Sequence, residues 1–145
     1  MRIAFLFVLL CVPRFAFDQA LAAASAARAF DGTWAVTLVV PNHTDEQGTA
    51  LGFTFHFMAT VKDGAFHGEY GLKDNPPWLS IDGPIHPDGS AEFAATGITG
   101  KAAYNLHKLG SGVPYNYQVK AHFEGAKGTG SRVSGRIGNF TFTKQ

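Results

Sequence analysis

The chain of 145 residues contains a single cysteine, Cys11, and only two methionines. One cysteine cannot form a disulfide within the chain, so burial of apolar side chains must hold the fold together. The longest apolar run, Ile3 to Val12, extends only about 15 Å as a helix and cannot cross a hydrocarbon core of ~30 Å. Charged residues make up 16% of the chain and the net charge is +1. This balance excludes the basic footprint on which nucleic-acid binding depends.

The N-terminal segment has the order of a secretory signal peptide. Arg2 precedes the apolar run, and small residues with repeated A-x-A spacing follow it, ending at Ala24, Ala26 or Ala29. We therefore expect residues 1–29 to be a removable signal helix and residues 30–145 to form one periplasmic or secreted domain. A helix that stays attached is the alternative. The exported part would have no cysteine, no membrane span and a net charge near −1.

Apolar and polar residues alternate along most of residues 30–145. The alternation is clearest over residues 53–61 and 115–123, where every second residue is aromatic, valine or alanine. A period of two is typical of a strand with one buried face, and no later segment has a convincing helical period. The predicted strands cover residues 34–40, 53–61, 65–73, 78–85, 91–96, 115–124, 131–135 and 139–144.

Turn residues separate these strands. Asp63-Gly64 and Asp88-Gly89 carry the strongest short hairpin signal, and glycines 125, 128 and 130 are expected to break the chain before its last two strands. The sequence therefore predicts an all-β fold, an antiparallel up-and-down barrel of about eight strands, since closure removes exposed edges. An open sandwich is the alternative.

The connections between the predicted strands alternate in length. The first, third and fifth, residues 41–52, 74–77 and 97–114, are longer than the tight turns at residues 62–64 and 86–89. Alternate connections of a meander lie at the same end, so we expect the longer ones to share one mouth. Loops long enough to carry function would gather there.

The domain begins Phe30-Asp31-Gly32-Thr33-Trp34, and its G-x-W resembles the start of lipocalin and avidin-like barrels. In those barrels the tryptophan plugs the closed end beneath a packed arginine. The resemblance implies a structural role for Trp34, with Arg132 or Arg136 as the stacking cation.

The sequence is also similar to small exported bacterial proteins of unknown function that begin with D-G-T-W. The similarity continues through a D-G turn and G-x-Y at residues 63–70, I-x-G-x-I-x-x-D-G at residues 81–89, and G-x-G…S-G-R at residues 128–136. It implies an exported barrel without a known activity.

Residues suited to catalysis or metal binding are sparse. The sequence has no G-x-S-x-G and no H-E-x-x-H, and no phosphate-binding glycine pattern. His56 and His67 flank a hairpin turn, but pairing of His67 with Thr60 would hold the histidines about 13 Å apart, too far to share a metal. Glu69 and Asp82 lie on adjacent predicted strands and are candidates for an acid–base pair, although solvated surface positions are commoner. We therefore expect a non-enzyme without metal or cofactor.

Aromatic side chains are the remaining signal. Trp78, Tyr104 and Tyr115 are expected at the mouth, and Tyr117 on an inward position below them, which makes these four the predicted ligand contacts. One hypothesis is an exported, non-catalytic barrel that binds a small apolar ligand. The alternative is an envelope protein-interaction module, or a protease-inhibitor-like barrel, with a solid core. An internal void of several hundred cubic ångströms would favour the ligand.

Overall fold

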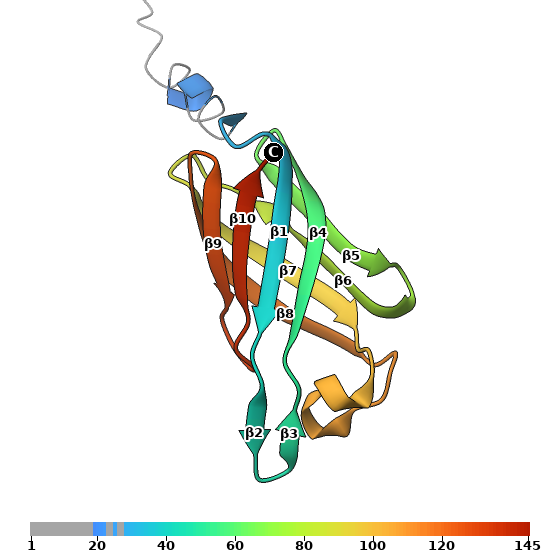
Figure 1. The fold of residues 1–145 in the computed structure, drawn as a ribbon. Coiled ribbons are helices and arrows are strands. Elements are labelled where there is room, and N and C mark those ends of the chain that lie inside the picture. The colour runs from blue at the N-terminus through green and yellow to red at the C-terminus, as the bar shows by residue number, and fades with distance from the viewer. Residues whose placement is uncertain (1–18, 23–24, 26–27) are drawn as a thin grey trace, which may run out of the picture.

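The computed structural model describes residues 19–22, 25 and 28–145, and its main feature is a closed antiparallel barrel of eight strands (Figure 1). Neighbours around the barrel follow the order β1-β10-β9-β8-β7-β6-β5-β4, which confirms the predicted meander. The strands are β1 (Gly32–Val40), β4 (Phe53–Lys62), β5 (Ala65–Leu72), β6 (Asn75–Pro84), β7 (Ser90–Ile98), β8 (Pro114–Glu124), β9 (Lys127–Arg132) and β10 (Asn139–Lys144).

The longer connections contain short elements of their own. A small hairpin of β2 (His43–Asp45) and β3 (Gly48–Ala50) extends the β1–β4 connection, and two 3-10 turns, η1 (Ala102–Tyr104) and η2 (Leu106–Lys108), lie between β7 and β8. Most of the predicted signal segment, residues 1–29, lies outside the described residues. No helix in the described part of the chain has the length and apolar character needed to span a membrane.

The alternating side chains face the interior as predicted. On β4, Phe57, Ala59 and Val61 are buried while the residues between them are exposed. The pairing of β4 with β5 sets His67 opposite Thr60, the register expected from the tight Asp63-Gly64 turn. Strand pairing thus places alternate residues of each strand on the inner and the outer face of the barrel.

Aromatic rings fill one half of the barrel. Trp34 is fully buried, its ring centroid is 5.2 Å from that of Phe123, and its Nε1 donates a hydrogen bond to the carbonyl of Phe30 at 2.8 Å. Phe66 stacks on Phe93 with centroids 4.6 Å apart, and Phe142 packs edge-on against Phe66 at 5.6 Å. Each ring removes ~150–250 Å² from water, so this half supplies much of the cohesion of a domain without disulfides.

The predicted stacking of an arginine on Trp34 is wrong. The guanidinium of Arg132 lies over the ring of Tyr117, and that of Arg136 lies nearest the ring of Phe53. Arg136 also bonds to the carbonyl of Pro41, just beyond the opposite end of β1 from Trp34. Trp34 packs against the ring of Phe123 instead, which meets its apolar surface without burying a charge.

The position of β9 also differs from the prediction, because the chain continues as a strand through Gly128 and Gly130. A Cβ at Gly128 would lie 2.8 Å from the Phe123 ring, and one at Gly130 would lie 2.9 Å from the Cβ of Ala121. These glycines therefore make room for side chains of β8 rather than breaking the chain. The turn is reduced to Gly125 and Ala126, and the last connection lengthens to residues 133–138.

The tight turns that follow β4, β6 and β8 lie together at one end of the barrel, called here the closed end. Asp31 holds one of them: its carboxylate accepts the backbone N–H groups of Asp63 and Gly64 at 2.9 and 3.0 Å. The Gly64 carbonyl in turn accepts the N–H of Ile85 at 2.8 Å. The D-G-T-W start is therefore a structural device, with the aspartate capping a hairpin and the tryptophan entering the core.

The first and fifth connections meet at the opposite end, called here the mouth. Figure 1 shows the β2–β3 hairpin of the first beside the 3-10 turns of the fifth. The N–H of Leu51 donates to the carbonyl of Ala103 at 2.8 Å, and Lys108 Nζ donates to the carbonyl of Thr49 at 2.5 Å. Pro77, near the start of β6, lies beside Gly100 of the fifth connection. The first and fifth connections therefore share the mouth as predicted, whereas the third is shorter than expected. It is only the turn Lys73-Asp74, because β5 and β6 pair as far as Leu72 and Asn75.

Candidate functional site

A cavity of about 560 Å³ occupies the mouth end of the barrel and is called here the mouth cavity. The ends of β1, β4, β7 and β8 and the 3-10 turns supply its walls, so it lies beyond the aromatic filling around Trp34. Its volume is within the range of small-molecule pockets, ~300–1,000 Å³. Its apolar side chains are Leu38, Val40, Phe53, Phe55, Pro77, Ile98, Leu106 and Leu109.

Arg136 ties the connections of the mouth to one another. It is only 6% exposed, and its Nη1 donates to the carbonyl of Tyr104 at 2.7 Å. Its Nη2 lies 2.6 Å from the carbonyls of Pro41 and Leu51 and 3.2 Å from that of Ala50. One side chain from the β9–β10 connection thus joins the start and end of the β2–β3 hairpin to η1.

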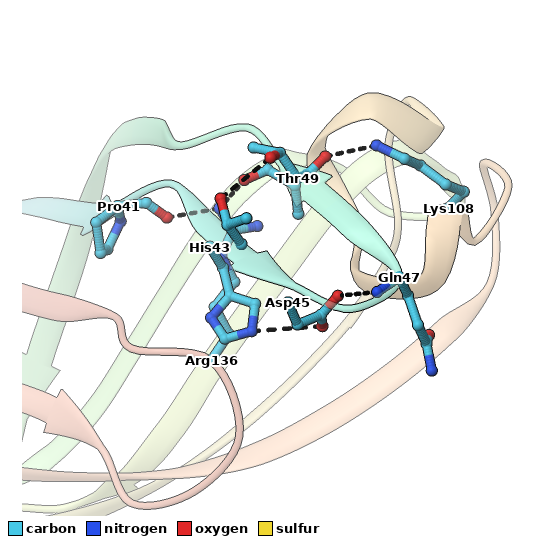
Figure 2. A network of polar contacts seen from close by, with 9 residues as sticks. Pro41, His43, Asp45, Gln47, Thr49, Lys108 and Arg136 are labelled. Atoms are coloured by element: carbon cyan, nitrogen blue, oxygen red, sulfur yellow. Dashed lines mark hydrogen bonds and ion pairs between the residues drawn. The ribbon is translucent and has the colours of Figure 1, made fainter.

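Figure 2 shows this arrangement around the small hairpin, with Arg136 reaching toward Pro41 and Lys108 toward Thr49 from the other side. The hairpin turn is ordered by Asp45, whose carboxylate accepts the backbone N–H of Gln47 at 2.8 Å. These contacts hold the β2–β3 hairpin at the mouth, beside the cavity but not in its lining.

Arg132, Tyr117 and Tyr115 form a stack along the cavity wall. The Arg132 guanidinium lies 3.8 Å from the centroid of the Tyr117 ring, and the two tyrosine rings are nearly parallel with centroids 6.0 Å apart. The Tyr115 hydroxyl donates to the carbonyl of Trp78 at 3.3 Å. Alternate positions on β8 place both rings on the inner face, and β9 brings the arginine across from the neighbouring strand.

Burial changes the ionisation of the groups in this stack. It raises the pKa of Tyr115 to about 12, against the smaller opposing effect of the Arg132 charge, and it also raises the pKa of Tyr117. Burial lowers the pKa of Arg132, while the two phenols act in the opposite direction. The pKa of Arg136 is lowered by burial and then by the like charge of Arg132. At neutral pH the phenols are neutral and the guanidinium groups remain charged.

Three of the four predicted ligand contacts, Tyr104, Tyr115 and Tyr117, line the mouth cavity, and the fourth, Trp78, does not. Trp78 lies within β6, three residues after the start of the strand, and its neighbour Pro77 lines the cavity instead. The Trp78 Nε1 is buried without a hydrogen-bond partner among the described residues. Its backbone carbonyl still belongs to the site, because it anchors Tyr115.

The sequence reasoning missed the residues of the 3-10 turns and the charged part of the wall. Lys101 and Leu106 lie in a long connection with no strand alternation, so no local pattern marked them as cavity residues. Arg132 and Arg136 were associated with Trp34 by resemblance, whereas a charged side chain on an inward strand position would have pointed to a cavity. Arg132 lies on the inner side of β9 with Gly128 and Gly130, which have no side chains to fill the space beside it.

The acid–base pair considered for Glu69 and Asp82 is not formed by the strand register. Glu69 lies opposite Ser80, and Asp82 lies opposite His67. Asp82 instead joins two other groups, accepting the Ser80 hydroxyl at 2.7 Å and lying 2.5 Å from Nδ1 of His67. The serine thus donates to the carboxylate and not to the imidazole, so the cluster lacks the nucleophile–base contact of acyl transfer.

Comparison with protein-family models, with curated proteins and with solved structures gives no match for this chain. The resemblances carried by Phe30–Trp34 and by the later glycine motifs therefore remain predictions from the sequence.

Proposed function

We propose that this chain is an exported, non-catalytic barrel that binds a small apolar ligand in the mouth cavity. The observation that carries the proposal is the division of the interior into a solid half and a hollow half. Around Trp34 the interior is filled by stacked rings, yet at the mouth about 560 Å³ remains between mainly apolar walls. Hollow apolar space weakens a core, because its lining loses packing contacts, and a bound molecule restores them.

A protein-interaction module or inhibitor-like barrel would leave no reason for the hollow half. Such a role uses the outer surface, and its interior would be most stable when packed throughout. Export is supported by the charged and apolar start of the sequence and by the A-x-A sites that follow it. The absence of cysteine from residues 30–145 is compatible with an oxidising compartment, since no thiol is available for unwanted disulfides.

The proposal is tested with N-phenyl-1-naphthylamine, an uncharged apolar dye that fluoresces when it leaves water. We expect the protein to take it up, and Leu106→Trp to weaken its binding about fivefold or more by occupying the cavity. Ile137→Trp is the matched control, because Ile137 is 64% exposed at the same end and does not line the cavity. Failure of the unmodified protein to bind, or equal losses in both variants, would contradict the proposal.

A further inference from the structure

The charges that line the mouth cavity are all of one sign. Lys101, Arg132 and Arg136 contribute to its walls, and neither an aspartate nor a glutamate does so. The ion pairs among the described residues involve other side chains, so neither arginine has a carboxylate partner there. The cavity therefore combines an apolar body with an uncompensated positive wall.

Both arginines also keep an unused hydrogen-bond donor. The Nε atoms of Arg132 and Arg136 are buried and have no acceptor among the described residues. Arg136 satisfies its other nitrogens with backbone carbonyls, whereas Arg132 is held by its stack on Tyr117. A buried guanidinium without a counter-charge is costly, and so is a buried N–H without an acceptor. An anion bound beside the two guanidinium groups would supply the missing counter-charge.

Arginine is suited to one kind of group in particular. Its planar guanidinium presents parallel N–H donors that match the two oxygens of a carboxylate, and burial strengthens the pairing relative to water. The remaining walls of the same cavity are apolar and carry no charge; they include Phe53, Phe55, Ile98 and Leu106. The chemistry of the two regions is complementary to a molecule with an acidic end and an apolar remainder.

We propose that the ligand of the mouth cavity is an amphipathic carboxylic acid, whose carboxylate faces Arg132 and Arg136 while its apolar body lies among the aromatic and aliphatic walls. This inference rests on the proposed function, because it names the class of molecule that the cavity holds. Arg132 is its specificity-determining residue, since among the described residues its guanidinium stacks on Tyr117 and donates no hydrogen bond to the backbone. Arg136 contributes charge in addition to its role in ordering the mouth.

The test compares matched probes that differ in charge. N-phenyl-1-naphthylamine and 8-anilinonaphthalene-1-sulfonate share one aromatic framework, and only the second is an anion. We expect the anion to bind at least about tenfold more tightly, and Arg132→Met to remove about tenfold of its affinity while changing that of the neutral dye less than about twofold. Lys127→Met is the control, because it removes an equal charge from an exposed residue that does not line the cavity.

A second measurement needs no variant. Decanoate and decanol, which differ only at the polar end, are compared as competitors for the neutral dye bound to the unmodified protein. Preferential displacement by decanoate, weakened at high salt, would support the inference. Equal competition by the two, together with equal binding of the two dyes, would overturn the carboxylate inference while leaving apolar ligand binding intact. Failure of every probe to bind would overturn the proposed function itself.

Discussion

Replacement of Arg136 by methionine should loosen the mouth without unfolding the barrel. Methionine retains much of the apolar stem but donates no hydrogen bond, so the carbonyls of Pro41, Leu51 and Tyr104 lose their shared partner. Each hydrogen bond from a charged donor is worth ~1.5–3 kcal/mol, giving a gross loss of ~4.5–9 kcal/mol for the three short bonds. Water can reach the freed carbonyls and no charge remains buried, so we expect a net local cost of about 2–4 kcal/mol.

Hydrogen exchange followed by mass spectrometry locates that cost. The N–H of Leu51, bonded to the carbonyl of Ala103, should exchange about 30- to 1,000-fold faster in Arg136→Met, as a cost of 2–4 kcal/mol implies. Amides of β7 and β8 near Phe93 should keep their protection, because the aromatic half of the barrel is untouched.

Two further variants distinguish the loss of the Arg136 hydrogen bonds from the loss of its charge and from a general effect of substitution at this connection. Arg136→Lys keeps the charge but has a single nitrogen, which cannot reach carbonyls from three segments, so it should resemble the methionine variant. Ile137→Ala, at an exposed neighbour, should leave Leu51 unchanged. Unaltered exchange at Leu51 in Arg136→Met, or equal acceleration throughout the barrel, would refute the role assigned to Arg136.

Three other changes test the remaining parts of the account. Gly128→Ala places a Cβ 2.8 Å from the Phe123 ring and should lower the free energy of unfolding in urea by ~1–3 kcal/mol, whereas Gly110→Ala, with nothing within 4 Å, should be nearly neutral. Asp31→Ala removes the acceptor of two hairpin amides and should cost ~1–2 kcal/mol by the same assay, with Asp31→Asn losing less; equal stability of all three forms would contradict the capping role. Because the pKa of Tyr115 is raised to about 12, the unfolded chain loses this proton first, and stability should fall as the pH rises above that of a free phenol. The stability of the unmodified protein relative to Tyr115→Phe should therefore decrease by about 1.4 kcal/mol between about pH 9 and about pH 11, and a constant difference would show that the phenol is not desolvated.

The barrel could be predicted from the sequence because its determinants are local. Alternation over residues 53–61 assigns an inner face, and Asp63-Gly64 determines the register that sets Thr60 opposite His67. The β9 boundaries could not be predicted in the same way. Gly128 and Gly130 look like turn residues in isolation, and only the neighbouring β8 side chains explain their presence within a strand.

The candidate site could be placed at one end but not described in detail. Counting connections located the mouth, and inward alternation identified Tyr115 and Tyr117. The role of Arg136 depends on carbonyls 32 to 95 residues distant in the sequence, which no local pattern encodes. Trp78 was expected at the mouth because it begins the predicted strand 78–85, directly after the connection 74–77. Strand β6 instead begins at Asn75, so Trp78 lies further along the strand and outside the cavity lining.

Native mass spectrometry of the protein purified from its own host tests the central claim most directly. The account predicts an additional mass, of the order of a drug-sized molecule, that leaves on denaturation and fragments as an apolar carboxylic acid. The contradicting result is a bare chain that also fails to take up N-phenyl-1-naphthylamine and decanoate when they are supplied in excess.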